Sequence, residues 1–338
     1  IRFVPMNLET GALAGDRGKL DEFDLIASVF APLTDGDERA LGLLDDAAVL
    51  PQAAGRDTVI TTDTMVEGIH FLDAEPPDVI ARRLLRVNLS DLASMGAEPA
   101  AYVLNLTLPA RTNKEWLSLF AEGLRVDQSA FGVRLLGGDT THTKRSLTVT
   151  ATLLGEVPTH GAITRGGARA GDDIYVSGTI GDASLGLKML ISGADNQDAL
   201  VKRFQLPEPR VSLGAKLRGL ATAMADVSDG LAADLVHICR ASKVSAIVYT
   251  DSIPLSVDVQ TSLAAGNTDM GEILSGGDDY ELVFTASPDT AGRIAAASQS
   301  AEVPITHIGR ISGGASEVIV LGPDGREIKL ETTGYRHF

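Results

Sequence analysis

The chain has 338 residues, of which 44% are hydrophobic and 22% are charged, and its formal net charge is −16. This length supports two globular domains, each with a core of its own. Such an acidic chain repels nucleic acids and anionic membranes, so we expect neither as a partner. No apolar run approaches the roughly 20 residues that a membrane-spanning helix requires.

The cysteine content and the first residues bear on the cellular compartment. Cys239 is the only cysteine, so an internal disulfide and a cysteine zinc cluster are excluded, which indicates the reducing cytoplasm. Residues 1–19 lack a charged start followed by an apolar stretch. We therefore expect a flexible tail there and not a signal peptide.

Helical and strand patterns alternate through the first half of the chain. Apolar spacing predicts a first helix over residues 23–30, and a proline pair before Asp78 opens a long helix that stops at Gly96. Thr112 and Glu115 have the spacing of a capping box at the start of a third helix. Strands are expected over residues 58–64, 101–108, 133–136 and 147–154.

A stretch rich in Gly, Thr and Arg over residues 158–171 marks the expected domain boundary. We predict a tail over 1–19, a first domain over 20–157 and a second domain over 158–338. The second domain has a helical pattern over 229–240, a hairpin signal at 323–325, and expected strands over 173–177, 224–227, 244–250, 280–285, 306–310 and 317–321. Several strands alternate polar and apolar residues, as half-covered antiparallel sheets do. The pattern favours two α+β domains over a doubly wound parallel sheet.

Aspartates recur beside Gly, Ser or Thr at or near expected strand ends. The motifs are Leu44-Asp45-Asp46-Ala47, Thr61-Thr62-Asp63-Thr64, Gly137-Gly138-Asp139-Thr140-Thr141 and Asp226-Val227-Ser228-Asp229-Gly230. Asp91 joins them from the long helix, one turn after Asn88. Each motif alone is better explained as a turn or a helix cap, and Asp229 suits a cap of its own helix. Together they indicate a Mg²⁺-dependent enzyme that acts on phosphate groups, because Mg²⁺ prefers dispersed oxygen ligands.

Other motifs for phosphate or metal chemistry are absent from the sequence. There is no Walker loop, protein-kinase motif, dinucleotide fingerprint or HExxH, and no histidine has metal-ligand spacing. Arg165 lies in a glycine-rich stretch, where it suits phosphate oxygens as well as it suits a solvated linker charge. The glycines of 178–181 fit a structural turn better than an anion site.

These motifs, with Asn88–Leu92, Met95–Ala97 and Ser275–Leu282, occur in the order found in the thiamine-monophosphate kinase family. The chain resembles that family over about residues 23–338, including its last five residues, 334–338. The family belongs to the superfamily of aminoimidazole ribonucleotide (AIR) synthetase and selenophosphate synthetase. The resemblance implies transfer of phosphate from ATP to thiamine monophosphate. It also implies two AIR-synthetase-like domains and a homodimer whose N-terminal domains pair in a barrel.

The resemblance also implies roles for individual residues. The implied Mg²⁺ ligands are Asp46, Thr61, Thr62, Asp63, Asp91, Asp139, Asp226 and Asp229. The implied ATP contacts are Gly138, Asp139, Arg165 and Ser228, and the implied thiamine-phosphate contacts are His70, Asp278 and Tyr335. Two positions depart from the family pattern, since Leu44 replaces the usual Gly and Asp278 replaces the Glu of many members.

The implied acceptor is a phosphate, and this explains the lack of a catalytic histidine. A phosphate monoester is mostly a dianion at neutral pH, because its second pKa is about 6, so no general base is required. Two unit charges about 4 Å apart repel by roughly 4 kcal/mol at an effective dielectric of about 20, so several Mg²⁺ ions are expected between the phosphates. Two alternatives stay open: another ATP-dependent synthetase of the superfamily, or a non-catalytic nucleotide- or metal-binding relative.

Overall fold

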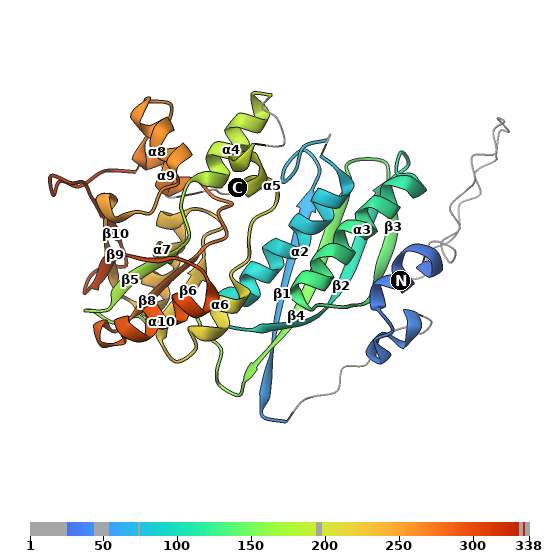
Figure 1. The fold of residues 1–338 in the computed structure, drawn as a ribbon, viewed down its shortest axis with the longest axis horizontal. Coiled ribbons are helices and arrows are strands. Elements are labelled where there is room, and N and C mark those ends of the chain that lie inside the picture. The colour runs from blue at the N-terminus through green and yellow to red at the C-terminus, as the bar shows by residue number, and fades with distance from the viewer. Residues whose placement is uncertain (1–25, 44–53, 74, 194–197, 331–333, 335–338) are drawn as a thin grey trace.

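The computed structural model describes residues 26–43, 54–73, 75–193, 198–330 and 334 (Figure 1). No helix among these residues is long and apolar enough to cross a membrane. The first half contains η1 (Ile26–Phe30), η2 (Ala31–Thr34), η3 (Glu38–Leu43), β1 (Arg56–Val66), α2 (Pro77–Ser94), β2 (Glu98–Pro109), α3 (Lys114–Phe131), β3 (Leu135–Thr143) and β4 (Thr148–Pro158). The second half contains β5 (Asp173–Ser177), α4 (Asp182–Ile191), α5 (Ala199–Gln205), α6 (Val211–Lys216), β6 (Ala221–Asp226), α7 (Leu231–Ser242), β7 (Ser245–Tyr249), η4 (Thr250–Ser252), α8 (Val257–Ala264), α9 (Met270–Ser275), β8 (Leu282–Ala286), η5 (Pro288–Thr290), α10 (Ala291–Ala301), β9 (Ile305–Ser312) and β10 (Val318–Leu321).

The first sheet has the strand order β1–β4–β2–β3, and helices α2 and α3 cover one of its faces (Figure 1). Strand β4 pairs antiparallel with β1 and β2, whereas β3 lies parallel to β2. Leu84, Leu117 and Leu124 of the two helices pack against Val149 and Leu153 of β4. The largely antiparallel pairing confirms the predicted α+β class.

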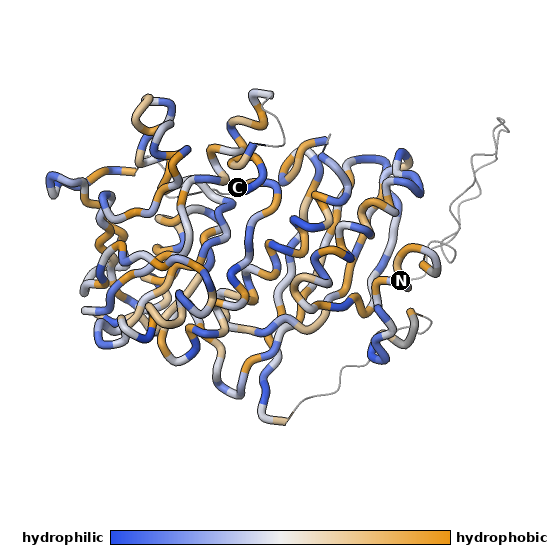
Figure 2. Tube along the Cα trace, viewed as in Figure 1, coloured by the Kyte–Doolittle hydropathy of each residue, from blue (hydrophilic) through white to orange (hydrophobic). Residues whose placement is uncertain are grey.

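The second sheet has the strand order β10–β7–β9–β5–β8–β6, with antiparallel central pairs and a parallel pair of β10 and β7. Helices α6 and α10 cover one face through Leu213 and Ile294. Helices α7 and α9 cover the other face through Leu235 and Ile273. Figure 2 shows that hydrophobic residues recur along many of the helices and strands and that hydrophilic residues occur in several of the loops.

Local signals at helix starts and turns have mixed outcomes. The long helix begins at Pro77 as expected. The predicted cap of α3 by Thr112 is wrong, because the Asn113 side chain accepts the N–H of Trp116 at 2.8 Å and caps the helix. An Asn side chain one residue later satisfies the same exposed donors. The hairpin signal near residue 324 is confirmed by a bond from Gly325 N–H to the Gly322 carbonyl at 2.9 Å.

Helix α2 connects the two domains, because one side packs on the first sheet and another side contacts α5, α6 and β6 (Figure 1). The Arg83 guanidinium on α2 donates to the Phe204 carbonyl of α5 at 2.8 Å. Gly214 of α6 lies so close to α2 that a β-carbon there would come within 2.1 Å of the Ala93 carbonyl oxygen. This close packing holds residues of α2 against the end of β6.

Candidate active site at the domain junction

Strand β1 and helix α2 bring three oxygen-bearing side chains together. The Thr61 hydroxyl donates to Asp91 at 2.5 Å, and Asp63 interacts with the same carboxyl. Burial, followed by the charge of Asp91, raises the pKa of Asp63 to about 7. Burial also raises the pKa of Asp91. These carboxyls are therefore crowded and poorly solvated.

The β1 motif does not lie at a strand end, as the sequence had suggested. Strand β1 continues to Val66 and pairs with β4 along its whole length, so Thr61 and Asp63 lie within it. Alternate strand residues point to opposite faces. The Thr62 hydroxyl accordingly bonds to the Ala151 carbonyl of β4 at 3.1 Å and is not brought together with Thr61 and Asp63.

Asp226 supplies a carboxyl from the second domain. It ends β6, as predicted, and is only 2% exposed. The Ser90 hydroxyl of α2 donates to Asp226 at 2.7 Å. Burial, then the charges of Asp91 and Asp234, raise the pKa of Asp226 well above its usual value. Carboxyls from both domains thus meet beside α2.

The start of α7 carries Ser228 and Asp229 next to this cluster. Asp229 is not the helix cap that the sequence suggested, because Gly230 takes that position. Instead, Asp234 in the first turn accepts the backbone N–H groups of Ser228 and Asp229 at 3.0 and 3.1 Å. Ligand atoms of Asp229, Asp234 and His237 lie within 4.8 Å of one another. Burial, with a contribution from Asp229, raises the pKa of Asp234 to about 7.

Arg165 lies on the exposed connection between the domains and directs its charge towards the cluster. Burial dominates the raised pKa values of Asp91, Asp226 and Asp234, and the charge of Arg165 opposes it at each of them. The backbone places this connection beside β6, because the Thr164 carbonyl accepts the N–H of Met224 at 3.0 Å. Arg165 therefore lies near enough for its charge to act on the carboxyls of the cluster.

The loop between α9 and β8 carries Asp278 next to the α7 start. The backbone N–H of Asp278 donates to the Ser228 carbonyl at 2.9 Å, and its side chain pairs with Arg83 of α2 at 2.9 Å. Asp278 and Tyr280 both have left-handed backbones, with φ of 68° and 51°. Such strain is held by the surrounding structure and is frequent at functional sites.

The other acidic residues of this loop have structural partners. Asp279 accepts the N–H groups of Gly181 and Ala183 at 2.7 and 3.1 Å. The N–H groups of Gly178 and Ile180 donate to the Pro304 and Pro254 carbonyls, so the turn at 178–181 is structural, as expected. Glu281 pairs with Arg203 and Arg210 at 2.9 and 2.5 Å.

Asp139 is not brought to the cluster within one chain. It lies inside β3, not after it, and pairs in register with Asn105 of β2. Strand β3 stands three strands from β1, which corresponds to about 14 Å across the sheet. The neighbouring Gly138 lies so close to β2 that a β-carbon would come within 1.8 Å of the Leu104 carbonyl oxygen, which gives this glycine a structural role.

Of three further predicted positions, the structure describes His70 but not Asp46 or Tyr335. His70 follows β1, and its Nδ1 accepts the N–H of Val66 at 3.1 Å. Asp46, the neighbouring Leu44 and Tyr335 lie outside the residues that the structure describes.

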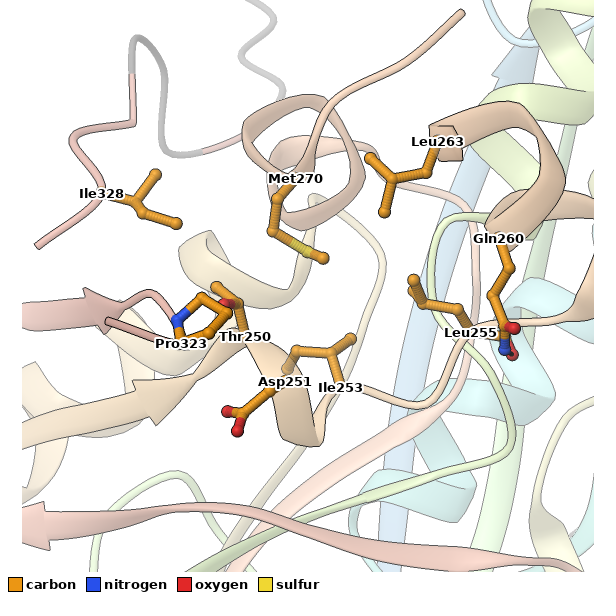
Figure 3. Close-up of a pocket in the computed structure, with 9 residues that line it drawn as sticks. All are labelled: Thr250, Asp251, Ile253, Leu255, Gln260, Leu263, Met270, Pro323 and Ile328. Atoms are coloured by element: carbon orange, nitrogen blue, oxygen red, sulfur yellow. Dashed lines mark hydrogen bonds between the residues drawn. The ribbon is translucent and has the colours of Figure 1, made fainter. Parts of the chain in front are cut away.

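A separate hollow of about 440 Å³ lies in the second domain (Figure 3). Its walls are mainly apolar, with Ile253, Leu255, Leu263, Met270 and Ile328 pointing towards one another. Among the residues that the structure describes, Asp251 is its one carboxylate, and no arginine, lysine or histidine lines it. The lining does not suit a phosphate, so the carboxyl cluster is the better candidate site.

The chain is similar to known proteins over nearly its whole length. The N-terminal and C-terminal domains of AIR synthase related protein match residues 44–157 and 169–322. The chain is 44% identical over 323 residues to the thiamine-monophosphate kinase of Caulobacter vibrioides, covering 94% of this chain and 90% of the relative. The chain belongs to the thiamine-monophosphate kinase family. The enzyme of Escherichia coli K12 is 39% identical, with 94% and 98% covered.

Solved structures of this kinase family share the fold. The thiamine-monophosphate kinase of Stenotrophomonas maltophilia superposes with a TM-score of 0.81 at 40% identity, covering 91% of this chain and 98% of that one. AaThiL, in complex with AMPPCP and TMP, gives a TM-score of 0.76 at 27% identity, with 95% and 100% covered.

The sequence analysis missed Ser90, Asp234 and Arg83, which the structure places at or beside the candidate site. Ser90 precedes Asp91 in a motif that was recognised, but its bond to Asp226 spans 136 residues of sequence. Asp234 lies five residues after Asp229, in the first turn of α7, and accepts the backbone N–H of Asp229. A search of that turn for a carboxylate that caps the preceding N–H groups would have found it. No sequence signal pairs Arg83 with Asp278, because domain packing creates that contact.

Proposed function

We propose that this chain transfers the γ-phosphate of ATP to the phosphate of thiamine monophosphate, giving thiamine diphosphate and ADP with the help of Mg²⁺. One observation carries the proposal most directly. Asp63 and Asp91, which are half-buried, meet Asp226, which is buried and comes from the second domain, and all three carboxyls have raised pKa values. In a chain of this family, such a cluster fits the binding of cations together with phosphate groups.

The donor set fits Mg²⁺. Every group of the cluster offers a hard oxygen, and the crowding that raises the carboxyl pKa values is what a divalent cation relieves. The side chains that would hold Mg²⁺ are Thr61, Asp63, Asp91, Asp226 and Asp229, and we extend the proposal to Asp46 and Asp139. Mg²⁺ bound there supplies the positive charge that offsets repulsion between the two phosphates.

Residues around the cluster would bind and align the two substrates. Arg165 would hold ATP phosphate oxygens through its guanidinium, and the loop of Ser228 would lie against the same nucleotide. Asp278, with His70 and Tyr335, would hold thiamine monophosphate. No residue is assigned as a general base, because a phosphate dianion attacks without losing a proton.

We further propose that the chain acts as a homodimer through its first domain, residues 20–157. The face of the first sheet opposite α2 carries Ile60, which is 64% exposed, together with Thr62 and Thr64 of β1. An apolar and threonine-rich sheet face of this kind suits burial against a second copy. Pairing would also give Asp139 a role, because Asp139 of one chain would complete the cluster of the other.

The reaction is tested by incubating the protein with ATP, MgCl₂ and thiamine monophosphate and measuring thiamine diphosphate by chromatography. We expect product with thiamine monophosphate and none with thiamine, whose hydroxyl would need a base. Absence of thiamine diphosphate from a protein that still binds ATP would sink the proposal. Phosphorylation of thiamine itself would point to a different kinase.

The shared site is tested with two inactive variants, Asp139→Asn and Asp91→Asn. Mixed dimers would contain one site with both substitutions and one intact site. Mixing the variants under conditions of subunit exchange should therefore restore about a quarter of wild-type activity. Dimers without any recovery on mixing would place Asp139 in the site of its own chain.

A further inference from the structure

Glu75 is a buried carboxylate that the proposed metal site does not use. It lies between β1 and the start of α2 and is 8% exposed. Neither of its carboxylate oxygens has a hydrogen-bond partner among the residues that the structure describes. A buried carboxyl without a donor destabilises the fold, because it has lost its hydrogen bonds to water and gained none from the chain. Such groups are rare in folded proteins and require an explanation.

Arg83 and Asp278 lie close to Glu75 and form with it what we call the Glu75 corner. Burial raises the pKa of Glu75, the charge of Arg83 lowers it, and the charge of Asp278 raises it. The Leu72 backbone N–H also lowers this pKa, but it does not reach hydrogen-bond geometry. The corner thus holds two carboxyls beside one guanidinium.

The guanidinium of Arg83 is committed to partners other than Glu75. It donates to the Phe204 carbonyl at 2.8 Å and to Asp278 at 2.9 Å. Its carbon also lies 3.9 Å from the centre of the Phe204 ring. These contacts fix Arg83 and leave both Glu75 oxygens, which are closed to solvent in this structure, without a donor from the described residues.

The Glu75 corner adjoins the carboxyl cluster. The Asp278 N–H bonds to Ser228, which follows Asp226 by two residues. Burial raises the pKa of Tyr280, and the charges of Asp278, Arg83, Asp63 and Asp226 also act on it. Groups of the Glu75 corner and of the cluster thus lie near the same tyrosine, so an acceptor whose phosphate lies at the cluster would have its head near the corner.

We propose that Glu75 accepts hydrogen bonds from the positively charged, N–H-bearing head of the phosphate acceptor and so determines acceptor specificity. The proposal rests on the proposed function, since thiamine monophosphate combines a terminal phosphate with a cationic thiazolium and an aminopyrimidine. A site built to accept such donors rejects phosphate esters that lack them, because its own buried oxygens would stay unpaired. Glu75 would act on acceptor binding and would leave ATP binding unaffected.

The test compares Glu75→Gln with the matched control Glu208→Gln. Glu208 lies between α5 and α6 and pairs with Arg86 of α2, the helix that carries Arg83. Because Glu208 is largely exposed, its substitution should leave the kinetics unchanged. We expect E75Q to raise the KM for thiamine monophosphate at least about tenfold, with kcat and the KM for ATP within about twofold of wild type. Thiamine, which has the cationic head and no phosphate, should compete with the acceptor in wild type and at least about tenfold more weakly in E75Q.

An unchanged acceptor KM in E75Q would overturn the inference, and so would a loss of kcat or of thermal stability with unchanged acceptor KM. If the wild type does not phosphorylate thiamine monophosphate, the proposed function fails separately. Calorimetric binding of thiamine to wild type and E75Q then decides the role of Glu75: weaker binding in E75Q supports it, and equal or absent binding in both overturns it.

Discussion

Two groups of buried or half-buried carboxyls in this protein have opposite surroundings. Asp127 on α3 is fully buried and accepts bonds from Arg82 at 3.1 Å and Arg86 at 2.7 Å. Glu281 has two arginine partners in the same way. In both cases the chain supplies the cations that a buried negative charge requires.

The cluster of Asp63, Asp91 and Asp226 has no matching set of cations among the residues that the structure describes. Hydroxyl groups donate to it, and Arg165 acts on it from the connection between the domains, but burial dominates and raises the carboxyl pKa values. Burial of a carboxyl therefore does not by itself identify the site. What distinguishes a metal-binding cluster from a structural ion pair is a group of buried and half-buried carboxyls whose charge the described residues leave uncompensated.

The largest expected effect is a loss of turnover, which we expect for the metal-site carboxyls and not for those in ion pairs. Asp91→Asn should lower kcat by about 1,000-fold or more, because it removes a ligand of the cations that stabilise the transferring phosphate. The same change should not lower the unfolding midpoint of metal-free protein, since it removes a crowded charge. Kinase assays and urea unfolding in EDTA measure the two quantities, and near-normal turnover would remove Asp91 from the metal site.

The converse effect is expected at Asp127. Asp127→Asn leaves the buried Arg86 without its main partner, so the free energy of unfolding should fall by about 3–5 kcal/mol. Among molecules that remain folded, the Mg²⁺ dependence of the kinase rate should be that of wild type. A variant with the wild-type urea midpoint would show that this ion pair does not stabilise the fold.

The pH dependence of metal-free protein sharpens the comparison. The pKa of Asp63 is about 7 in the folded state, above its value in the unfolded chain, so the folded state binds its proton more tightly. Its stability contribution is full at pH values below the unfolded pKa and is lost as pH rises towards 7. Between pH 5 and 7 the loss should be on the order of 2 kcal/mol. Urea unfolding in EDTA should show a flatter pH slope for Asp63→Asn, and identical slopes would contradict the assignment.

The smallest expected effect concerns Ser90, which positions Asp226 through its hydroxyl. Ser90→Ala should weaken Mg²⁺ binding by about tenfold while lowering the free energy of unfolding by only about 1 kcal/mol. The Mg²⁺ concentration that gives half-maximal rate measures the first quantity. Ser94→Ala is a matched control, because Ser94 lies one turn later on α2 and bonds only to the Asp91 carbonyl among the contacts that the structure describes.

Much of the fold could be predicted because its signals are local. Polar and apolar alternation indicated antiparallel strands, and the proline pair at the start of α2 and the end of β6 at Asp226 were both located correctly. Thr61 and Asp139 were wrongly placed at strand ends, because sheet pairing extends β1 and β3 through their motifs. Boundaries such as these depend on the neighbouring strands, which a local pattern does not contain.

The site was predictable in its parts but not in its assembly. Single aspartates in their motifs suggested metal ligands, yet the bonds between Ser90 and Asp226 and between Arg83 and Asp278 arise only when α2 packs against the second domain. The family resemblance supplied the acceptor, which no spacing in the chain contains. The domain division at residue 157 and the reducing compartment stay predictions.

The most direct test of the central claim is the proton balance of Mg²⁺ binding. Isothermal titration of metal-free protein with MgCl₂ at pH 7, in buffers with different ionisation enthalpies, counts the protons released. We predict release of at least about half a proton per chain, since Asp63 alone would be half protonated before Mg²⁺ binds, and less release from Asp63→Asn. Mg²⁺ binding whose heat is the same in every buffer would contradict the account.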